Sequence, residues 1–329
     1  MFDKIKNPIL FQGDLKKRNY FEGWYFKQVS EDERNVISFI PGISLREDDP
    51  HCFIQYIFLQ IDSDGRSVMK SGYCRYPLDS FKIQDRPFRI DVSGNLFTES
   101  FVSIHLKDGP VEISGRLDYG RFTPIRQSFS MPNIMGYFAY IPRMECYHGI
   151  ISMEHTVSGK LAILGGSIDF GHGKGYLEKD WGTSFPEKYI WIQCNLFKNS
   201  TTSMLLSVAK IPFIHRSFQG FLANITTNGK EYRFATYNGS RMCVESVTDR
   251  TVKVVMESRR AKIEVEALIQ QPAELIAPEK GKMKIRIKEE LSGIIHFTLT
   301  DKQTGQSYVD DGRIAGIEIV GYFDEGRPS

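Results

Sequence analysis

The side chains that could do chemistry are concentrated in residues 175–197, GYLEKDWGTSFPEKYIWIQCNLF. Two carboxyl groups stand here two positions apart, on Glu178 and Asp180. Alternate residues of a β-strand share a face, so we expect Tyr176, Glu178 and Asp180 on one side and Lys179 on the other. In a shared cavity, desolvation and like-charge repulsion raise the pKa of one carboxyl group, while a nearby Lys keeps the other ionised. One carboxyl group could then donate a proton at neutral pH.

A second run of alternating residues follows the turn that contains Gly182 and Pro186. One face of this run, KYIWIQCNLF, is aliphatic and suits a protein core. The other face carries aromatic and amide side chains: Tyr189, Trp191, Gln193 and Asn195. Ligand pockets combine aromatic walls with a few placed polar groups, so this face is typical of a cavity lining. The rings of Trp181 and Trp191 could stabilise a cationic intermediate by about 0.5–2 kcal/mol each.

The charged residues of this stretch also have a simpler interpretation. Glu178, Lys179, Glu187 and Lys188 could form solvated ion pairs between neighbouring strands. Exposed pairs of this kind contribute little to stability. The pattern alone leaves both interpretations open.

The hydrophobic pattern that must position these residues has a period of two along most of the chain. Turn signals at Asp64-Gly65 and Asn228-Gly229 each separate two alternating runs and predict β-hairpins. Further alternating runs predict separate strands at 252–256, 263–267, 283–287 and 295–299. No window keeps helical spacing of apolar residues for longer than about a dozen residues, the usual helix length. The sequence therefore predicts an all-β fold.

Two short motifs echo each other, YFEGWYFKQV at 20–29 and YLEKDWG at 176–182. Glu22 and Glu178 lie 156 positions apart, close to the length of one eight-stranded small-molecule barrel. A chance match of so short a pattern is the alternative. If the echo is real, two barrel-like halves would account for it.

Composition and charge limit the classes to which the protein could belong. Lys and Arg number 42 and Asp and Glu 40, and this near balance gives no basic footprint for nucleic acid. Charges and Pro8 interrupt the amino-terminal apolar residues, and no run reaches transmembrane length, so we expect a soluble, cytoplasmic protein. Five cysteines without CxxC spacing favour reduced thiols. The spacing of His148 and His155 favours core or surface roles over a metal site.

With these residues in view, the chain resembles the tocopherol cyclase family. Residues 175–197 are similar to the family's Tyr-x-Glu-Lys-x-Trp-Gly-x-x-Phe-Pro block followed by Trp-x-Gln-Cys-Asn-x-Phe. YFEGWYFK at 20–27 matches its amino-terminal motif, and AGIEIVG at 315–321 looks like its closing strand. Gly23-Trp24 also looks like the Gly-x-Trp opening strand of lipocalins, in which the Trp closes one end of the barrel. The resemblance implies an all-β chain of two lipocalin-like β-barrel halves, residues 1–165 and 166–329.

The resemblance also implies an acid-catalysed reaction. Family members close a prenylated hydroquinone to a chromanol by protonating an alkene and trapping the tertiary carbocation with a phenolic oxygen, and related proteins hydrate isoprenoids. No metal or redox cofactor is required. On this chain we expect Asp180 or Glu178 as the proton donor and Lys179 or Lys188 as its charge partner. The expected contacts with an apolar, isoprenoid substrate are Tyr176, Trp181, Trp191, Gln193, Asn195, Glu22, Trp24 and Lys27.

Two other functions fit the same residues. The chain could be a lipocalin-like carrier that binds an apolar or isoprenoid ligand without converting it. It could also be a peripheral membrane protein that collects lipid from a bilayer. A carboxyl group of perturbed pKa that points into a closed pocket would favour the enzyme over the carrier. Residues 60–145 match the family only in general strand character, so the sequence does not predict prenyl length or head group.

Overall fold

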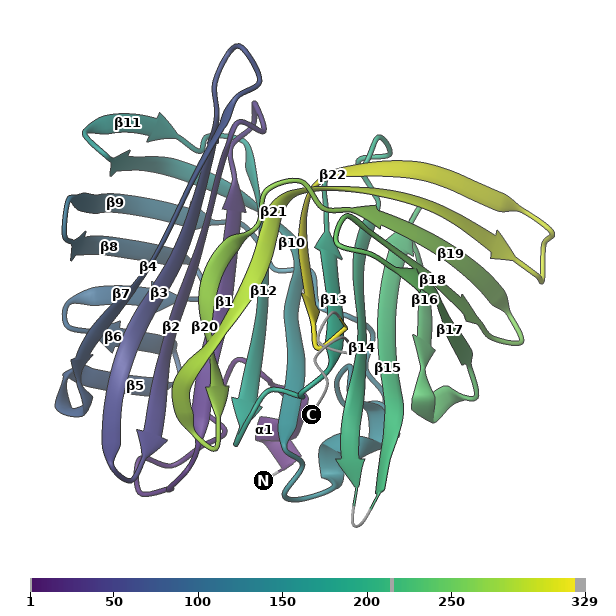
Figure 1. Cartoon of the computed structure of the whole chain (residues 1–329), viewed down its shortest axis with the longest axis horizontal. Helices are drawn as coiled ribbons and strands as arrows, with labels where there is room; N and C mark the ends of the chain where they lie inside the picture. The colour runs from purple at the N-terminus through teal and green to yellow at the C-terminus, as the bar shows by residue number, and fades with distance from the viewer. Residues whose placement is uncertain (1, 214–215, 323–329) are drawn as a thin grey trace, which may run out of the picture. The chain divides into compact units, whose positions relative to one another are not determined.

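The computed structural model describes residues 2–213 and 216–322. Within these residues most of the chain is β-strand, arranged in two antiparallel sheets (Figure 1). The described helices are short: α1 (Phe2–Lys6) and the 3-10 helices η1 (Leu78–Ser80), η2 (Gly136–Tyr140) and η3 (Thr236–Asn238). The prediction of an all-β fold is confirmed.

The first sheet contains the first twelve strands of the chain. They are β1 (Phe21–Val29), β2 (Asn35–Arg46), β3 (Asp49–Ile61), β4 (Ser67–Pro77), β5 (Phe81–Asp85), β6 (Phe88–Val92), β7 (Asn95–Thr98), β8 (Phe101–Asp108), β9 (Val111–Tyr119), β10 (Cys146–Ile163), β11 (Gly166–Asp169) and β12 (Gly173–Gly182). Their order is β4-β3-β2-β1-β12-β10-β9-β8-β7-β6-β5, and β11 pairs with β10. The first and last strands of this sheet in sequence, β1 and β12, are therefore hydrogen-bonded neighbours.

The second sheet contains the remaining ten strands. They are β13 (Tyr189–Cys194), β14 (Ser203–Phe213), β15 (Arg216–Thr227), β16 (Lys230–Ala235), β17 (Arg241–Val247), β18 (Thr251–Glu257), β19 (Ala261–Leu268), β20 (Ala273–Glu279), β21 (Lys282–Asp301) and β22 (Ser307–Val320). Their order is β16-β15-β14-β13-β22-β21-β19-β18-β17, and β20 pairs with β21. Between described strands, neither sheet has a ladder that joins its two ends.

Both hairpins predicted from turn residues are present. The Asp64-Gly65 turn connects β3 to β4, and the Asn228-Gly229 turn connects β15 to β16. Asn228 and Gly229 have φ of +49° and +73°, the left-handed values that a tight two-residue hairpin requires. The prediction was wrong at 283–299, where the two expected strands are one long strand, β21. The ladder between β21 and β22 continues past register shifts near Gly293, so the strand does not end there. The alternation of apolar residues does not reveal such an irregularity.

Contacts divide the described chain into two compact units. The first contains residues 2–135, 139–185 and 274–286, and the second contains 136–138, 186–213, 216–273 and 287–322. Residue 165, at the end of the first half defined from the sequence, lies within the first unit. Segment 274–286 is held in the first unit by hydrogen bonds: the backbone N–H of Ile276 donates to Gln55 (2.7 Å), and the hydroxyl of Ser44 donates to the carbonyl of Gly281 (2.7 Å).

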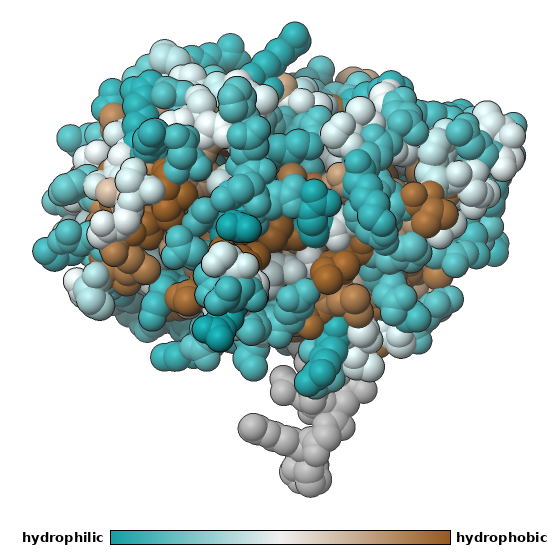
Figure 2. All heavy atoms as spheres, turned by 90° about the horizontal axis from the view of Figure 1, so that it is seen from above, coloured by the Kyte–Doolittle hydropathy of each residue, from teal (hydrophilic) through white to brown (hydrophobic). Residues whose placement is uncertain are grey.

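The core of the first unit lies on one face of its sheet. Alternate residues of each strand contribute to it, among them Trp24 and Phe26 of β1 and Leu177 and Trp181 of β12. This alternation fixes which face of β12 points into the core and which does not. On the molecular face in Figure 2, hydrophilic side chains predominate and hydrophobic ones form separate patches. Among the described residues, no helix is long and apolar enough to cross a membrane.

The two echoing motifs do not occupy equivalent positions in two halves. They lie in neighbouring strands of one sheet, β1 and β12, with Glu22 opposite Trp181 and Trp24 opposite Lys179. Directly paired residues share a face, so Glu22 is on the face of Lys179 and not on that of Glu178. The interpretation of Glu22 as a counterpart of Glu178 in the other half was therefore wrong. The two motifs instead pair with each other across neighbouring strands.

Candidate functional site

Strand β12 places its side chains on the two faces that the alternation predicts. Its neighbours are β1 on one side and β10 on the other. Glu178 is paired with Tyr25 of β1 and Ile150 of β10, and Asp180 is paired with His148 of β10. Because paired residues share a face, these side chains lie together on the face opposite the core.

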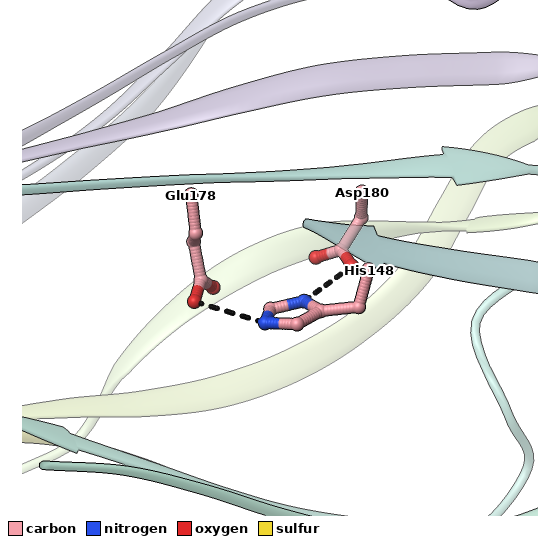
Figure 3. Close-up of side chains that lie close together, drawn as sticks. All are labelled: His148, Glu178 and Asp180. Carbon is pink, nitrogen blue, oxygen red and sulfur yellow. Dashed lines mark hydrogen bonds and ion pairs between the residues drawn. The ribbon is translucent and has the colours of Figure 1, made fainter. Parts of the chain in front are cut away.

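His148 lies between the two carboxyl groups (Figure 3). Its Nδ1 is 2.8 Å from Oδ1 of Asp180, and its Nε2 is 3.4 Å from Oε2 of Glu178. The first contact is a hydrogen bond and the second is an ion-pair contact. All three side chains are largely buried, with Asp180 the most exposed at 25%. The hydroxyl of Tyr176 donates a further hydrogen bond to Glu178.

The two carboxyl groups favour a protonated imidazole. Burial lowers the pKa of His148, but the negative charges of Glu178 and Asp180, together with the hydrogen bond to Asp180, outweigh it and raise the pKa to about 9. The cation is therefore the dominant form at neutral pH. Burial and the charge of Glu178 also raise the pKa of Tyr176 well above its ordinary value, so its hydroxyl stays a donor.

The same three residues have the chemistry of metal ligands. One ligand atom from each of His148, Glu178 and Asp180 lies within 4.8 Å of the others. However, the two ring nitrogens face different carboxylates, so a metal would bind only one nitrogen and would displace at least one of these contacts. The observed arrangement fits a shared proton better than a metal ion.

The opposite face of β12 holds a second buried charge cluster. Nζ of Lys179 is 2.7 Å from Oε1 of Glu22 and 2.6 Å from the carbonyl of Leu10, and both charged side chains are fully buried. The ammonium group also lies over the rings of Trp24 (4.8 Å) and Trp181 (4.7 Å). Burial lowers the pKa of Lys179 to about 8, although Glu22 opposes the shift.

The carboxylate of Glu22 has its acceptor positions filled. It accepts hydrogen bonds from the backbone N–H groups of Gln12 (2.8 Å) and Gly13 (2.9 Å) and from the hydroxyl of Tyr20 (2.6 Å), in addition to Lys179. The indole of Trp24 donates to the carbonyl of Ile9 at 2.8 Å. This cluster thus attaches segment 9–13 to β1 and β12.

The remaining residues expected at the site are distributed over both units. Lys27 is buried on β1, opposite Tyr176 of β12. In the second unit, Trp191 and Gln193 are buried on β13, and Asn195 is buried just beyond its end. Nζ of Lys188 lies 4.2 Å from the centre of the Tyr322 ring. The structure brings together Tyr176, Glu178 and Asp180 in one cluster, and Glu22, Trp24, Lys179 and Trp181 in another.

Sequence reasoning missed His148 as a partner of the carboxyl groups. The residue is 32 positions before Asp180, and the pairing of β10 with β12 passes through two register shifts. No local spacing could reveal the contact. The alternation in residues 146–157, CYHGIISMEHTV, does predict that His148 lies on a strand, and this strand is close in sequence to β12.

The family assignment rests on sequence. A family model described as tocopherol cyclase-like matches residues 118–321, more than half of the chain. The chain belongs to this family. Among curated relatives, the probable chloroplastic tocopherol cyclase of Oryza sativa subsp. japonica is 27% identical over 141 residues, which cover 42% of this chain and 30% of the rice protein. The chloroplastic tocopherol cyclase of Zea mays is 28% identical over 109 residues, or 32% of this chain and 23% of the maize protein. The matched regions thus span less than a third of either relative, and the resemblance noted from the motifs is confirmed.

Solved structures share the fold of this tocopherol cyclase-like protein. CghA superposes with a TM-score of 0.55 at 10% identity, over 92% of this chain and 88% of CghA, and CghA has also been solved with Sch210972. Kievitone hydratase from Nectria haematococca superposes with a TM-score of 0.50 at 9% identity, over 91% of this chain and 88% of the hydratase. At these identities the likeness concerns the fold alone, and the expected lipocalin-like fold class is confirmed.

Proposed function

We propose that this protein is an acid catalyst that cyclises a prenylated hydroquinone, or hydrates a related isoprenoid. The observation that carries the proposal is the buried His148 imidazole held between Asp180 and Glu178. The membership in the tocopherol cyclase-like family supports the substrate class. The name of kievitone hydratase, a protein of the same fold, supports addition of water as the alternative outcome.

In this mechanism Asp180 is the proton donor. Its side chain is the most exposed of the three, and it accepts a hydrogen bond from Nδ1 of His148. The Nδ1 proton moves to Asp180, whose carboxyl group protonates the alkene carbon. The charge of the imidazolium is thereby transferred to a tertiary carbocation, which lies beside the carboxylates of Asp180 and Glu178.

The second step closes the ring and restores the catalyst. The phenolic oxygen forms a C–O bond with the carbocation, and its proton returns to the imidazole of His148. With water as the nucleophile, the same steps give an alcohol. Atoms and charge balance without an oxidant or a reductant, so these steps need no redox cofactor.

The other side chains have proposed roles that follow from their faces. Glu178 orients the imidazole, and Tyr176 in turn orients Glu178. The role of charge partner, suggested from the sequence for Lys179 or Lys188, passes to His148, because Lys179 lies on the core face with Glu22. The aromatic side chains on the face of Asp180 include Tyr176, Tyr25 and Phe21, and we propose them as walls for the carbocation.

Four of the remaining candidates keep their proposed contacts, and three take a structural role. We retain Trp191, Gln193 and Asn195 as ligand contacts of the second unit and Lys27 as a contact of the first. Glu22, Trp24 and Trp181 hold the strands that carry the catalytic groups, through the cluster around Lys179.

The test is turnover of a prenylated hydroquinone, followed as chromanol by mass-resolved chromatography. We expect Asp180→Asn to lower kcat at least a hundredfold, since general acid catalysis contributes about 10²–10⁴-fold. Glu178→Gln and His148→Gln should lower it less. Asp169→Asn, which changes an exposed carboxylate paired with Lys160, is the matched control and should leave kcat unchanged. If the wild-type protein and the variants all bind the hydroquinone and none of them forms product, the carrier function is favoured instead.

A further inference from the structure

The connection from β9 to β10 carries the most exposed large hydrophobic side chain among the described residues. This side chain is Phe129, which is 83% exposed. Single apolar side chains are common on protein surfaces, so the exposure alone does not identify a binding site. The way in which the chain presents this ring, and the charges around it, give the exposure a meaning.

A tight turn presents Phe129 at its tip. The backbone N–H of Ser128 donates to the carbonyl of Met131 (2.9 Å), and the N–H of Met131 donates to the carbonyl of Ser128 (3.2 Å). Phe129 and Ser130 are the two residues between them. The hydroxyl of Tyr140 donates to the carbonyl of Phe129 at 2.9 Å, and the two ring centres are 6.4 Å apart. The backbone of the tip is thus ordered before any partner binds, which lowers the entropic cost of binding.

The base of the turn is attached to α1. Nε2 of Gln127 donates to the carbonyl of Lys6 (2.8 Å), and Nδ2 of Asn133 donates to the carbonyl of Ile5 (2.9 Å). These two bonds place the end of α1 beside the turn. We call the turn, the Tyr140 ring and the end of α1 the Phe129 surface; all of it belongs to the first unit.

The charges around the Phe129 surface are mainly positive. Residues 122–144 contain Arg126 and Arg143 and no Asp or Glu. Both Arg residues are exposed, and so is Lys6. Asp3, the one carboxylate of α1, is in an ion pair with an Arg side chain and is thereby neutralised. This side of the first unit therefore attracts an anionic partner.

A lipid bilayer fits these features better than a protein partner does. A stable protein interface buries about 800 Å² of continuous surface on each partner. Here the neighbours of Phe129 at the tip, Ser128 and Ser130, are exposed and polar. A lone projecting ring needs no complementary pocket in fluid acyl chains. Tyr rings favour the level of the head groups, and each Lys or Arg near an anionic bilayer strengthens binding about fivefold.

We infer that the Phe129 surface docks the protein peripherally on an anionic lipid bilayer. Phe129 inserts at the boundary of the acyl chains, Tyr140 lies among the head groups, and the positive side chains contact lipid phosphates. The inference goes beyond the proposed function, because it concerns the surface on which the protein binds and not the reaction that it catalyses.

Vesicles of two compositions test the inference directly. The full-length wild-type protein is sedimented with vesicles of phosphatidylcholine alone, or of phosphatidylcholine with about one third phosphatidylglycerol. We expect about tenfold stronger binding to the anionic vesicles at about 0.1 M salt. The difference should disappear at about 1 M salt, where charges are screened beyond about 3 Å. Equal binding to the two compositions at low salt, or no binding to either, would overturn the inference.

Phe129→Ser tests the inserted ring. We expect this variant to bind anionic vesicles about tenfold more weakly, because it loses the burial of one aromatic side chain. It should unfold at the same urea concentration as the wild-type protein, since the ring is exposed. The control is Val68→Ser, which removes a side chain that is 50% exposed beside the Asp64-Gly65 turn, at the opposite end of the first unit from α1 (Figure 1). The control should change binding less than twofold, and equal effects would contradict the inference.

The positive side chains have a matched test of their own. Lys6→Gln and Arg143→Gln should each weaken binding to anionic vesicles about fivefold. Arg66→Gln removes the same charge at the Asp64-Gly65 turn and should change binding less than twofold. If all three variants lose the same affinity, binding depends on net charge alone and the Phe129 surface is not the docking site.

A fluorescent side chain at the tip reports insertion. The three native tryptophans, Trp24, Trp181 and Trp191, are buried. Anionic vesicles should therefore shift the emission of Phe129→Trp to shorter wavelength and leave that of the wild-type protein unchanged. An unshifted emission with bound vesicles would refute insertion. If Phe129→Ser instead abolishes self-association of the free protein in analytical ultracentrifugation, the surface is a contact between copies and the inference fails.

Discussion

Oε1 of Glu22 lies 2.7 Å from Nζ of Lys179, and neither side chain is exposed to solvent. The pair joins the first and last long strands of the first sheet in sequence, β1 and β12, in the interior of the first unit. A buried ion pair gains its stability from complete satisfaction of both charges, so loss of one partner leaves the other uncompensated.

We therefore expect Lys179→Met to lower the free energy of unfolding by about 3–5 kcal/mol, because Glu22 would keep a buried charge. Urea unfolding measures the change. The control is Lys160→Met, which removes an exposed partner of Asp169 and should cost less than about 1 kcal/mol. Equal effects of the two substitutions would contradict the structural role of the buried pair. A fall in kcat at unchanged stability would instead restore Lys179 to the catalytic group.

The titration of His148 predicts a pH dependence of stability. Its pKa is about 9 in the folded protein, above its ordinary value of 6.5. The protonated ring therefore adds stability that is fully present below pH 6.5 and is lost as the pH rises through 9. The shift corresponds to about 3 kcal/mol. The free energies of unfolding of the wild-type protein and of His148→Gln should thus differ most near pH 6 and converge above about pH 9. If the difference between the two proteins does not change with pH, the ring is not held as a cation.

The close approach of β10 to β12 depends on Gly182. Its φ is +150°, and a Cβ there would lie 2.2 Å from the carbonyl oxygen of Glu145, a backbone atom that cannot move aside alone. We expect Gly182→Ala to cost at least about 2 kcal/mol and to separate His148 from Asp180, which would lower the pKa of His148. The control is Gly65→Ala, where φ is also positive but no atom lies within 4 Å; it should cost about 1 kcal/mol. NMR titration of His148 in both variants checks the prediction.

The cysteines should differ in reactivity in the folded protein. All five are free, and Cys243 is exposed. Burial raises the pKa of Cys52 and of Cys74 to about 12, and burial together with the charge of Asp180 raises that of Cys146 well above its ordinary value. Iodoacetamide near neutral pH should therefore label Cys243 first, since the thiolate is the reacting form. Mass spectrometry of the native and the urea-unfolded protein checks this order, and early labelling of Cys146 would contradict it.

The parts of the fold that depend on neighbouring residues were predictable from the sequence. The faces of β12 follow from alternation, and the hairpins at Asp64-Gly65 and Asn228-Gly229 follow from turn chemistry. The continuous β21 was not predictable, because an irregular register near Gly293 interrupts the alternation without ending the strand.

The candidate site was predictable only in part, for a related reason. Glu178 and Asp180 share a strand, so their common face can be read from the sequence. The contacts of Lys179 with Glu22 and of Asp180 with His148 depend on which strands pair and in which register. Long-range pairing is determined by the packing of the whole sheet, and no spacing within one strand encodes it.

Segment 274–286 completes the first unit, although residues 186–273 of the second unit precede it in the chain. During synthesis, the ribosome therefore releases strands β13 to β19 before the last hydrogen-bonding partners of Ser44 and Gln55 exist. The amino-terminal unit cannot finish folding in the order in which it is made. The protein departs from the vectorial, domain-by-domain route that many nascent chains follow, and its first unit becomes complete only after most of the second has emerged.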